Sequence, residues 1–164
     1  MAGAKRSGAV DALLRGALRA ADGIPLECLR GKRLLLVEDQ PTDLARLVAL
    51  LGRLGGDDLE VSSARTASAA LDICRSHGGR FDIVLLNHLL GPAEDTGLEL
   101  LGLLQRAGLP TSAKAVLYSA NMPVELVRLA RAAGFDETLE GDAIDAITLR
   151  DTFNRLLPSA AAAD

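Results

Sequence analysis

Polar residues or glycine follow four apolar runs of this 164-residue chain, and these positions are the best placed to do chemistry. They are Glu38 with Asp39, Asn87, Ser119 and Gly141. Adjacent carboxylates at the end of a strand favour a nearby cation, and Mg²⁺ prefers carboxylate and water ligands. An Asp at position 87 would complete a metal site or act as a nucleophile. The amide of Asn87 is not a nucleophile and is a weak ligand, so the chemistry of this chain depends largely on that residue.

The apolar spacing between residues 31 and 157 predicts five strands, each followed by a helix. The expected strands are 32–38, 59–64, 81–86, 113–118 and 137–139. The expected helices are 41–54, 66–77, 96–107, 123–133 and 144–157. Short connections between such pairs predict an α/β fold, a doubly wound parallel sheet with right-handed crossovers. The carboxyl ends of its strands then meet at one edge, where the four polar positions gather. The last helix is expected to direct Ile147 inward, together with Leu149 and Phe153.

Residues 1–30 precede this unit as an N-terminal extension, and 158–164 is expected to be a frayed tail. The extension has apolar residues at helical spacing, at Val10, Leu13, Leu14, Ala17, Leu18 and Ala21. This apolar stripe predicts an amphipathic helix. Leu14 and Leu18 could pack on the chain's own domain, dock a partner protein or form a symmetric dimer. The sequence favours neither its own domain nor a partner.

Composition excludes several classes of protein. The net charge is −4 without a large basic block, which argues against binding of nucleic acid. No apolar run approaches the ~20 residues needed to span a membrane, so a cytoplasmic protein is expected. With three Phe, one Tyr and no Trp, the core must consist of aliphatic side chains. The spacing of Cys28 and Cys74 fits no metal motif, and both are expected to be reduced thiols.

Four segments in order resemble the receiver domain of bacterial response regulators, over about residues 32–157. They are LLLVEDQ, FDIVLLNHLLGPAEDTGLELL, AVLYSA and AAGFDETLEG. The resemblance implies a CheY-like fold with strand order 2-1-3-4-5. It also implies a pocket in which an Asp takes a phosphoryl group from a histidine kinase. In that family Mg²⁺ is held by the acid pair and the Asp, while a lysine and a Ser/Thr bind the phosphoryl oxygens.

The chain departs from this family at the positions that carry the reaction. Asn87 replaces the phosphoacceptor Asp, and Gly141 replaces the lysine. Lys114, the last lysine of the chain, lies at the opposite end of its strand. Thr138 replaces the aromatic residue that couples to the switch hydroxyl, here Ser119. These changes predict a pseudo-receiver without phosphorylation and without a required cofactor. Its metal site, Glu38 and Asp39, should be empty or weakly occupied by Mg²⁺, unless Asn87 instead hydrogen-bonds to the acid pair.

The predicted function is therefore a non-enzymatic module of two-component signalling or cell-cycle control that binds other proteins. Its partner would be a histidine kinase, a response regulator or an adaptor, or a second copy of the chain. The helices at 123–133 and 144–157, with the strand between them, are the expected docking surface. Arg128, Arg131 and Arg150 are its candidate residues.

Two other functions are open. One is a sensor of a small ligand such as a nucleotide, bound in the crevice at the strand ends. The other is an enzyme that uses Ser119 with His88, for which the sequence gives little support. His88 is otherwise expected to be an ordinary loop residue. His77 is expected at the surface near the end of a helix, where a cation is mildly favoured.

Overall fold

The computed structural model describes residues 25–92, 94–141 and 144–158. A parallel five-stranded sheet lies at its centre, with the order β2-β1-β3-β4-β5. The strands are β1 (Arg33–Val37), β2 (Glu60–Ala64), β3 (Ile83–Asn87), β4 (Lys114–Ser119) and β5 (Glu137–Glu140). The predicted doubly wound sheet and its 2-1-3-4-5 order are thus confirmed.

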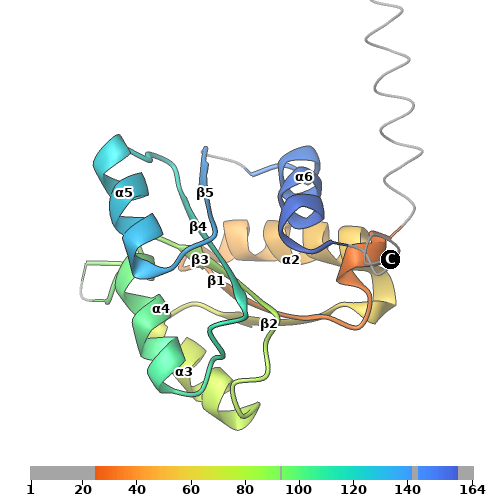
Figure 1. Cartoon of the computed structure of the whole chain (residues 1–164), viewed down its shortest axis with the longest axis horizontal. Coiled ribbons are helices and arrows are strands. Elements are labelled where there is room, and N and C mark those ends of the chain that lie inside the picture. The colour runs from red at the N-terminus through yellow and green to blue at the C-terminus, as the bar shows by residue number, and fades with distance from the viewer. Residues whose placement is uncertain (1–24, 93, 142–143, 159–164) are drawn as a thin grey trace, which may run out of the picture.

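Helices cover both faces of the sheet (Figure 1). The α-helices are α2 (Pro41–Gly55), α3 (Ala67–Ser76), α4 (Gly97–Arg106), α5 (Val124–Ala133) and α6 (Ala146–Leu156). Two short 3₁₀ turns, η1 (Glu27–Leu29) and η2 (Gly56–Asp58), flank β1 and β2 in the chain. One hydrophobic cluster joins the sheet to α3, α4 and α5, and the other joins it to η1, α2 and α6.

Side chains alternate between these two clusters along the central strands. In β1, Leu35 and Val37 belong to the α3–α5 cluster, whereas Leu34 and Leu36 belong to the α2–α6 cluster. Successive residues of a strand point to opposite faces, so a run that is apolar throughout is typical of a strand buried on both sides. Tyr118 belongs to the α2–α6 cluster, which directs its ring to the same face as Leu36.

Several helices start later than the sequence predicts, because the expected first residues act as caps. Thr66 and Thr96 precede their helices and accept hydrogen bonds from the backbone three residues on. Asp145 does the same for α6, so that helix begins at Ala146 rather than at 144. The third strand starts at Ile83 instead of 81, because the N–H of Phe81 bonds to Gly79 in the turn after α3.

One expected core residue lies at the surface. Ile147 is 45% exposed, whereas Leu149 and Phe153 of the same helix are fully buried. The prediction that Ile147 points inward is therefore wrong for the described part of the chain. A helix of period 3.6 that buries positions 149 and 153 turns position 147, two residues from Leu149, toward another side. Cys28 and Cys74 are both free, as expected, and both are buried.

Candidate functional site

Asn87 lies at the centre of a hydrogen-bonded cluster at the carboxyl edge of the sheet. It is the last residue of β3, while Glu38 and Asp39 follow β1. The side-chain nitrogen of Asn87 donates to Oε1 of Glu38 at 3.1 Å and to Oδ1 of Asp39 at 3.2 Å. It also donates to the carbonyl oxygen of Leu89 at 3.1 Å. The predicted alternative, in which the amide pairs with the acid pair, is the arrangement that the structure shows.

Glu38 is the most buried acid of this cluster, with 3% of its surface exposed. The hydroxyl of Tyr118 donates to its Oε2 at 2.6 Å, and the N–H of Gln40 donates to its Oε1 at 3.1 Å. Burial raises the pKa of Glu38, although the hydrogen bonds from Tyr118 and Gln40 act in the opposite direction. Burial and the neighbouring Glu38 also raise the pKa of Tyr118, which keeps its hydroxyl protonated as a donor.

Tyr118 is a site residue that sequence reasoning missed. It precedes Ser119 in β4, and β4 is separated from β1 by β3. Its hydroxyl therefore reaches across the neighbouring strand to Glu38. The sequence contains one indication of this role: Tyr118 is the only tyrosine of the chain, and it directly precedes a polar residue at a strand end. A buried tyrosine usually places its hydroxyl against a polar partner, and the carboxylates at this edge supply one.

The packing of α4 also fixes the position of Asn87. Gly97, the first residue of α4, donates its N–H to the carbonyl oxygen of His88 at 2.7 Å. A Cβ at position 97 would lie 2.1 Å from the carbonyl oxygen of Asn87, far inside van der Waals contact. Glycine is thus required where the helix start meets the end of β3.

A small pocket of about 110 Å³ opens beside this cluster. Its lining residues are Glu38, Gln40, Asp43, Arg46, Asn87, Tyr118, Ala120, Gly141 and Ile144. Ligand pockets for small molecules usually enclose roughly 300 Å³ or more, so this volume argues against a bound nucleotide. Of the five predicted pocket residues, Glu38, Asn87 and Gly141 line this pocket.

Arginine supplies the positive charge around the pocket. Arg46 of α2 lines it and donates to the carbonyl oxygen of Ile144 at 2.6 Å. Arg65 donates to the carbonyl oxygen of Asp39 at 3.3 Å. Gly141 adopts a φ of 154°, and Lys114 is the first residue of β4 at the opposite edge, as expected. No lysine lies among the residues that line this pocket.

The cluster fits a divalent cation poorly. Among the residues that the structure describes, no three His, Cys, Asp or Glu side chains gather as metal ligands. The Asn87 nitrogen, which cannot ligate, faces both carboxylates and uses oxygens that a cation would need. Whether Mg²⁺ binds weakly to Glu38 and Asp39 stays a prediction.

Ser119 lies beside this pocket but lines a different hollow. That hollow, of about 440 Å³, is lined by His88, Leu89, Ser119, Ala120, Asn121, Pro123, Glu125, Leu126 and Leu129. Ser119 and His88 thus share a surface, as the enzyme alternative requires. The Nδ1 atom of His88 is buried without a hydrogen-bond partner in the described residues, and burial lowers the pKa of this histidine. A general base must come within hydrogen-bond reach of its nucleophile, and the Nδ1 atom of His88 makes no such contact.

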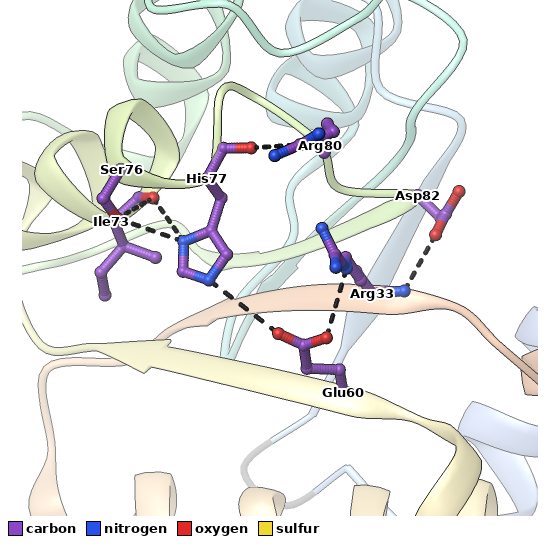
Figure 2. A network of polar contacts seen from close by, with 7 residues as sticks. All are labelled: Arg33, Glu60, Ile73, Ser76, His77, Arg80 and Asp82. Carbon is purple, nitrogen blue, oxygen red and sulfur yellow. Dashed lines mark hydrogen bonds and ion pairs between the residues drawn. The ribbon is translucent and has the colours of Figure 1, made fainter.

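His77 belongs to a polar network at the opposite, amino-terminal edge of the sheet (Figure 2). It follows α3 and directs Nδ1 to the carbonyl oxygen of Ile73 at 2.9 Å. Its Nε2 lies 3.9 Å from Glu60 of β2, which also pairs with Arg33 of β1 at 3.2 Å. These contacts tie α3 to the starts of two strands, so His77 has a structural role.

The candidate partner residues fall into two groups. Arg128 and Arg131 are exposed on α5, where Arg128 pairs with Glu125, and Arg150 of α6 is half-buried. Leu14 and Leu18 lie outside the described residues, as do the rest of the predicted N-terminal helix and most of the predicted tail. In the described part of the chain, no helix is long and apolar enough to cross a membrane.

Comparison with protein-family models and with curated protein sequences gives no match. Solved structures do match. The chemotaxis protein CheY4 of Vibrio cholerae has a TM-score of 0.67 and 21% identity, over 77% of this chain and 98% of that one. A CheY-like receiver domain from Methylobacillus flagellatus has a TM-score of 0.61 and 24% identity, over 76% of this chain and 98% of that one.

A response regulator protein from Burkholderia pseudomallei, solved with a phosphorylated aspartic acid and a calcium ion, has a TM-score of 0.62. It is 21% identical, over 80% of this chain and 69% of that one. The chain therefore has the receiver fold.

Proposed function

We propose that this chain is a pseudo-receiver of bacterial two-component signalling, which takes no phosphoryl group and acts by binding another protein in the cytoplasm. The observation that carries this proposal is the Asn87 amide, which donates hydrogen bonds to both Glu38 and Asp39. A phosphoacceptor must present a free carboxylate oxygen as a nucleophile. An amide in that place removes the nucleophile and occupies the acids that would hold the metal.

The Gly141 position supports the same conclusion. A lysine ammonium there would supply a charge-assisted hydrogen bond of about 1.5–3 kcal/mol to a phosphoryl group. Gly141 offers no side chain, and its φ of 154° is unfavourable for residues with a Cβ. Arg46 also lines the pocket, where one of its nitrogens is held by the Ile144 carbonyl oxygen. Losing both the nucleophile and the cation makes residual phosphoryl transfer implausible on chemical grounds.

A direct test is incubation with acetyl phosphate and Mg²⁺, followed by intact-mass measurement. The wild type should gain no phosphoryl adduct, and Asn87→Asp alone should gain little, because position 141 supplies no ammonium. The double variant Asn87→Asp/Gly141→Lys should gain more than the single variant, provided that its circular dichroism shows a folded domain. A stable adduct on the wild type would overturn the proposal. Strong labelling of Asn87→Asp alone would show that the lysine is not needed.

The proposed docking surface is formed by α5, β5 and α6. Arg128 and Arg131 project from α5, and Arg155 of α6 pairs with Glu137 of β5 at 2.9 Å. Arginines and acids alternate on this surface, as in the pairs Arg128–Glu125 and Arg155–Glu137, which suits a partner with charged groups of both signs, and arginine is enriched in protein interfaces. We expect that partner to be a histidine kinase, a response regulator or an adaptor, or a second copy of the chain.

Charge reversal tests this surface. The variant Arg128→Glu/Arg131→Glu should lose a signalling partner that the wild type captures. Arg75→Glu on α3, near the edge strand β2, serves as the control and should keep it. If Arg128→Glu/Arg131→Glu captures as much of that partner as Arg75→Glu does, the interface lies elsewhere on the domain.

A further inference from the structure

The hollow of about 440 Å³ beside the strand-end pocket has the composition of a small-molecule site. Such sites usually enclose roughly 300–1,000 Å³ and combine apolar walls with a few polar groups. The apolar part consists of Leu126, which is buried, and of Leu89 and Leu129, which are 64% and 40% exposed. In the described part of the chain five large apolar side chains are exposed, and two of them line this hollow. The folded domain therefore leaves an apolar surface uncovered here.

Ser119 supplies an unused polar group at the inner end of the hollow. Along β4, Leu117 belongs to the α3–α5 cluster and Tyr118 to the α2–α6 cluster, so Ser119 points to the α3–α5 side, where the hollow lies. Ser119 is buried, with 6% of its surface exposed, yet its hydroxyl makes no hydrogen bond within the described residues. Buried hydroxyls usually have a partner. This unpaired hydroxyl indicates where the polar group of a ligand would bind.

Hydrogen bonds hold both walls of the hollow in place. On one wall, the carbonyl oxygen of Leu89 accepts from the side-chain nitrogen of Asn87 at 3.1 Å. On the other wall, the loop at 120–123 is held by the N–H of Met122, which donates to Oε1 of Glu140 at 3.2 Å. A preformed hollow of this kind binds a ligand without the entropic cost of ordering its loops.

The charges around the hollow disfavour an anionic ligand. Of the described residues that line it, none is lysine or arginine. The start of α5, whose N-cap Pro123 makes no side-chain hydrogen bond, would attract an anion, but Glu125 already places a negative charge in that turn. A cationic ligand is poorly matched as well, because Arg128 donates to the Glu125 carboxylate at 3.0 Å. Nucleotides and other phosphate compounds are therefore poor candidates, and an uncharged ligand is favoured.

We propose that this hollow binds a small uncharged molecule that is mostly apolar and carries one hydroxyl or amide group. The apolar part lies against Leu89, Leu126 and Leu129, and the polar group hydrogen-bonds to the Ser119 hydroxyl. The site is distinct from the strand-end pocket at Asn87, and it does not depend on the proposed signalling role.

NMR titration of the full chain with three probes of similar size tests the class of ligand. Benzyl alcohol has an apolar ring and one hydroxyl, toluene lacks the hydroxyl, and benzoate carries a charge. Benzyl alcohol should cause saturable shifts of the backbone amides at 88–89 and 119–129, and the other two probes should bind more weakly. One hydrogen bond changes affinity by about two- to tenfold, so Ser119→Ala should bind benzyl alcohol more weakly by that factor and no longer prefer it to toluene. If the wild type shows no saturable shifts at these residues, or binds the three probes equally, the proposal is wrong.

Matched variants test the place of the site. Leu129→Asp puts a charge into the hollow, whereas Val48→Asp puts the same charge on α2, at a residue of similar exposure (37%) outside the hollow. Leu129→Asp should lose the shifts caused by benzyl alcohol, and Val48→Asp should bind it as the wild type does. Leu89→Asp repeats the test from the loop wall, where the side chain is too exposed to be needed for folding. Equal binding by all of these variants would contradict the proposal.

Dilution of the wild type without a probe separates a small ligand from a second copy of the chain. The amides at 88–89 and 119–129 should keep their shifts at every protein concentration. If they change with concentration, a second copy covers the hollow and the assignment to a small molecule is wrong.

Discussion

Replacing Asn87 with Asp should destabilise the domain in the absence of a divalent cation. The two hydrogens of the Asn87 amide are shared among two carboxylates and one carbonyl oxygen, and a carboxylate at position 87 would donate to none of them. Hydrogen bonds to charged groups contribute about 1.5–3 kcal/mol each. Two unit charges 4 Å apart repel by roughly 4 kcal/mol at an effective dielectric constant of 20, and partial exposure of this edge reduces that value. Two such bonds at the low end give about 3 kcal/mol, and the repulsion adds to this, so the free energy of unfolding at pH 7 should fall by about 3 kcal/mol or more.

Urea denaturation with and without Mg²⁺ provides the assay. Asn87→Ala is the matched control, because it removes the donor without adding a charge. It should lose less stability than Asn87→Asp, and the difference measures the repulsion. A metal bound only by the folded state adds about 2.7 kcal/mol at a hundredfold excess over its Kd. Mg²⁺ should thus rescue Asn87→Asp and leave Asn87→Ala unchanged. If Mg²⁺ stabilised the wild type as much as it stabilises Asn87→Asp, the argument that the amide displaces the cation would be refuted.

Three further predictions concern the packing and titration of the same cluster. Gly97→Ala should lower the free energy of unfolding by about 1–3 kcal/mol, because its Cβ meets the Asn87 carbonyl. Gly102→Ala in the same helix has room for a Cβ and should raise the free energy of unfolding by about 0.5–1 kcal/mol. Tyr118→Phe should cost about 1.5–3 kcal/mol, because it leaves the buried Oε2 of Glu38 unpaired; a change below about 0.5 kcal/mol would contradict this. The raised pKa of Glu38 means that its contribution to stability is complete below its ordinary value of 4.5 and is lost as the pH rises through the folded-state value. Denaturation between pH 4 and 7 should show this loss in the wild type but not in Glu38→Gln.

Local sequence patterns were enough to predict the order and type of the helices and strands. Each central strand is a short apolar run, and the Gly55-Gly56 pair ends the predicted helix where α2 ends. The same apolar runs predict that Asn87 lies at the end of β3. The parallel arrangement of the strands predicts that Glu38 and Asp39 lie near it. The strand order came from the resemblance to receivers and agrees with the structure.

The contact between Tyr118 and Glu38 could not be predicted in this way. It depends on the registers of two strand pairs, in which Val37 lies opposite Leu86 and Leu86 opposite Leu117. A shift of one residue in either pair would turn Tyr118 to the other face of the sheet or away from Glu38. No local pattern encodes such a register. The predicted helix ends differ from the observed ones by one or two residues. The reason is that the sequence pattern does not distinguish a cap residue from the first residue of the helix.

Tyr118 and Asn87 together supply neutral hydrogen-bond donors to the acid pair. In a site built for a metal, the charge of the ion offsets the cost of burying carboxylates. Here neutral donors surround Glu38, namely the Tyr118 hydroxyl, the Asn87 amide and the Gln40 N–H. Each stabilises the acid through a hydrogen bond, and the raised pKa of Glu38 shows that burial still disfavours its charge. These neutral donors therefore stabilise the Glu38 carboxylate, and the Asn87 nitrogen uses carboxylate oxygens that a cation would need.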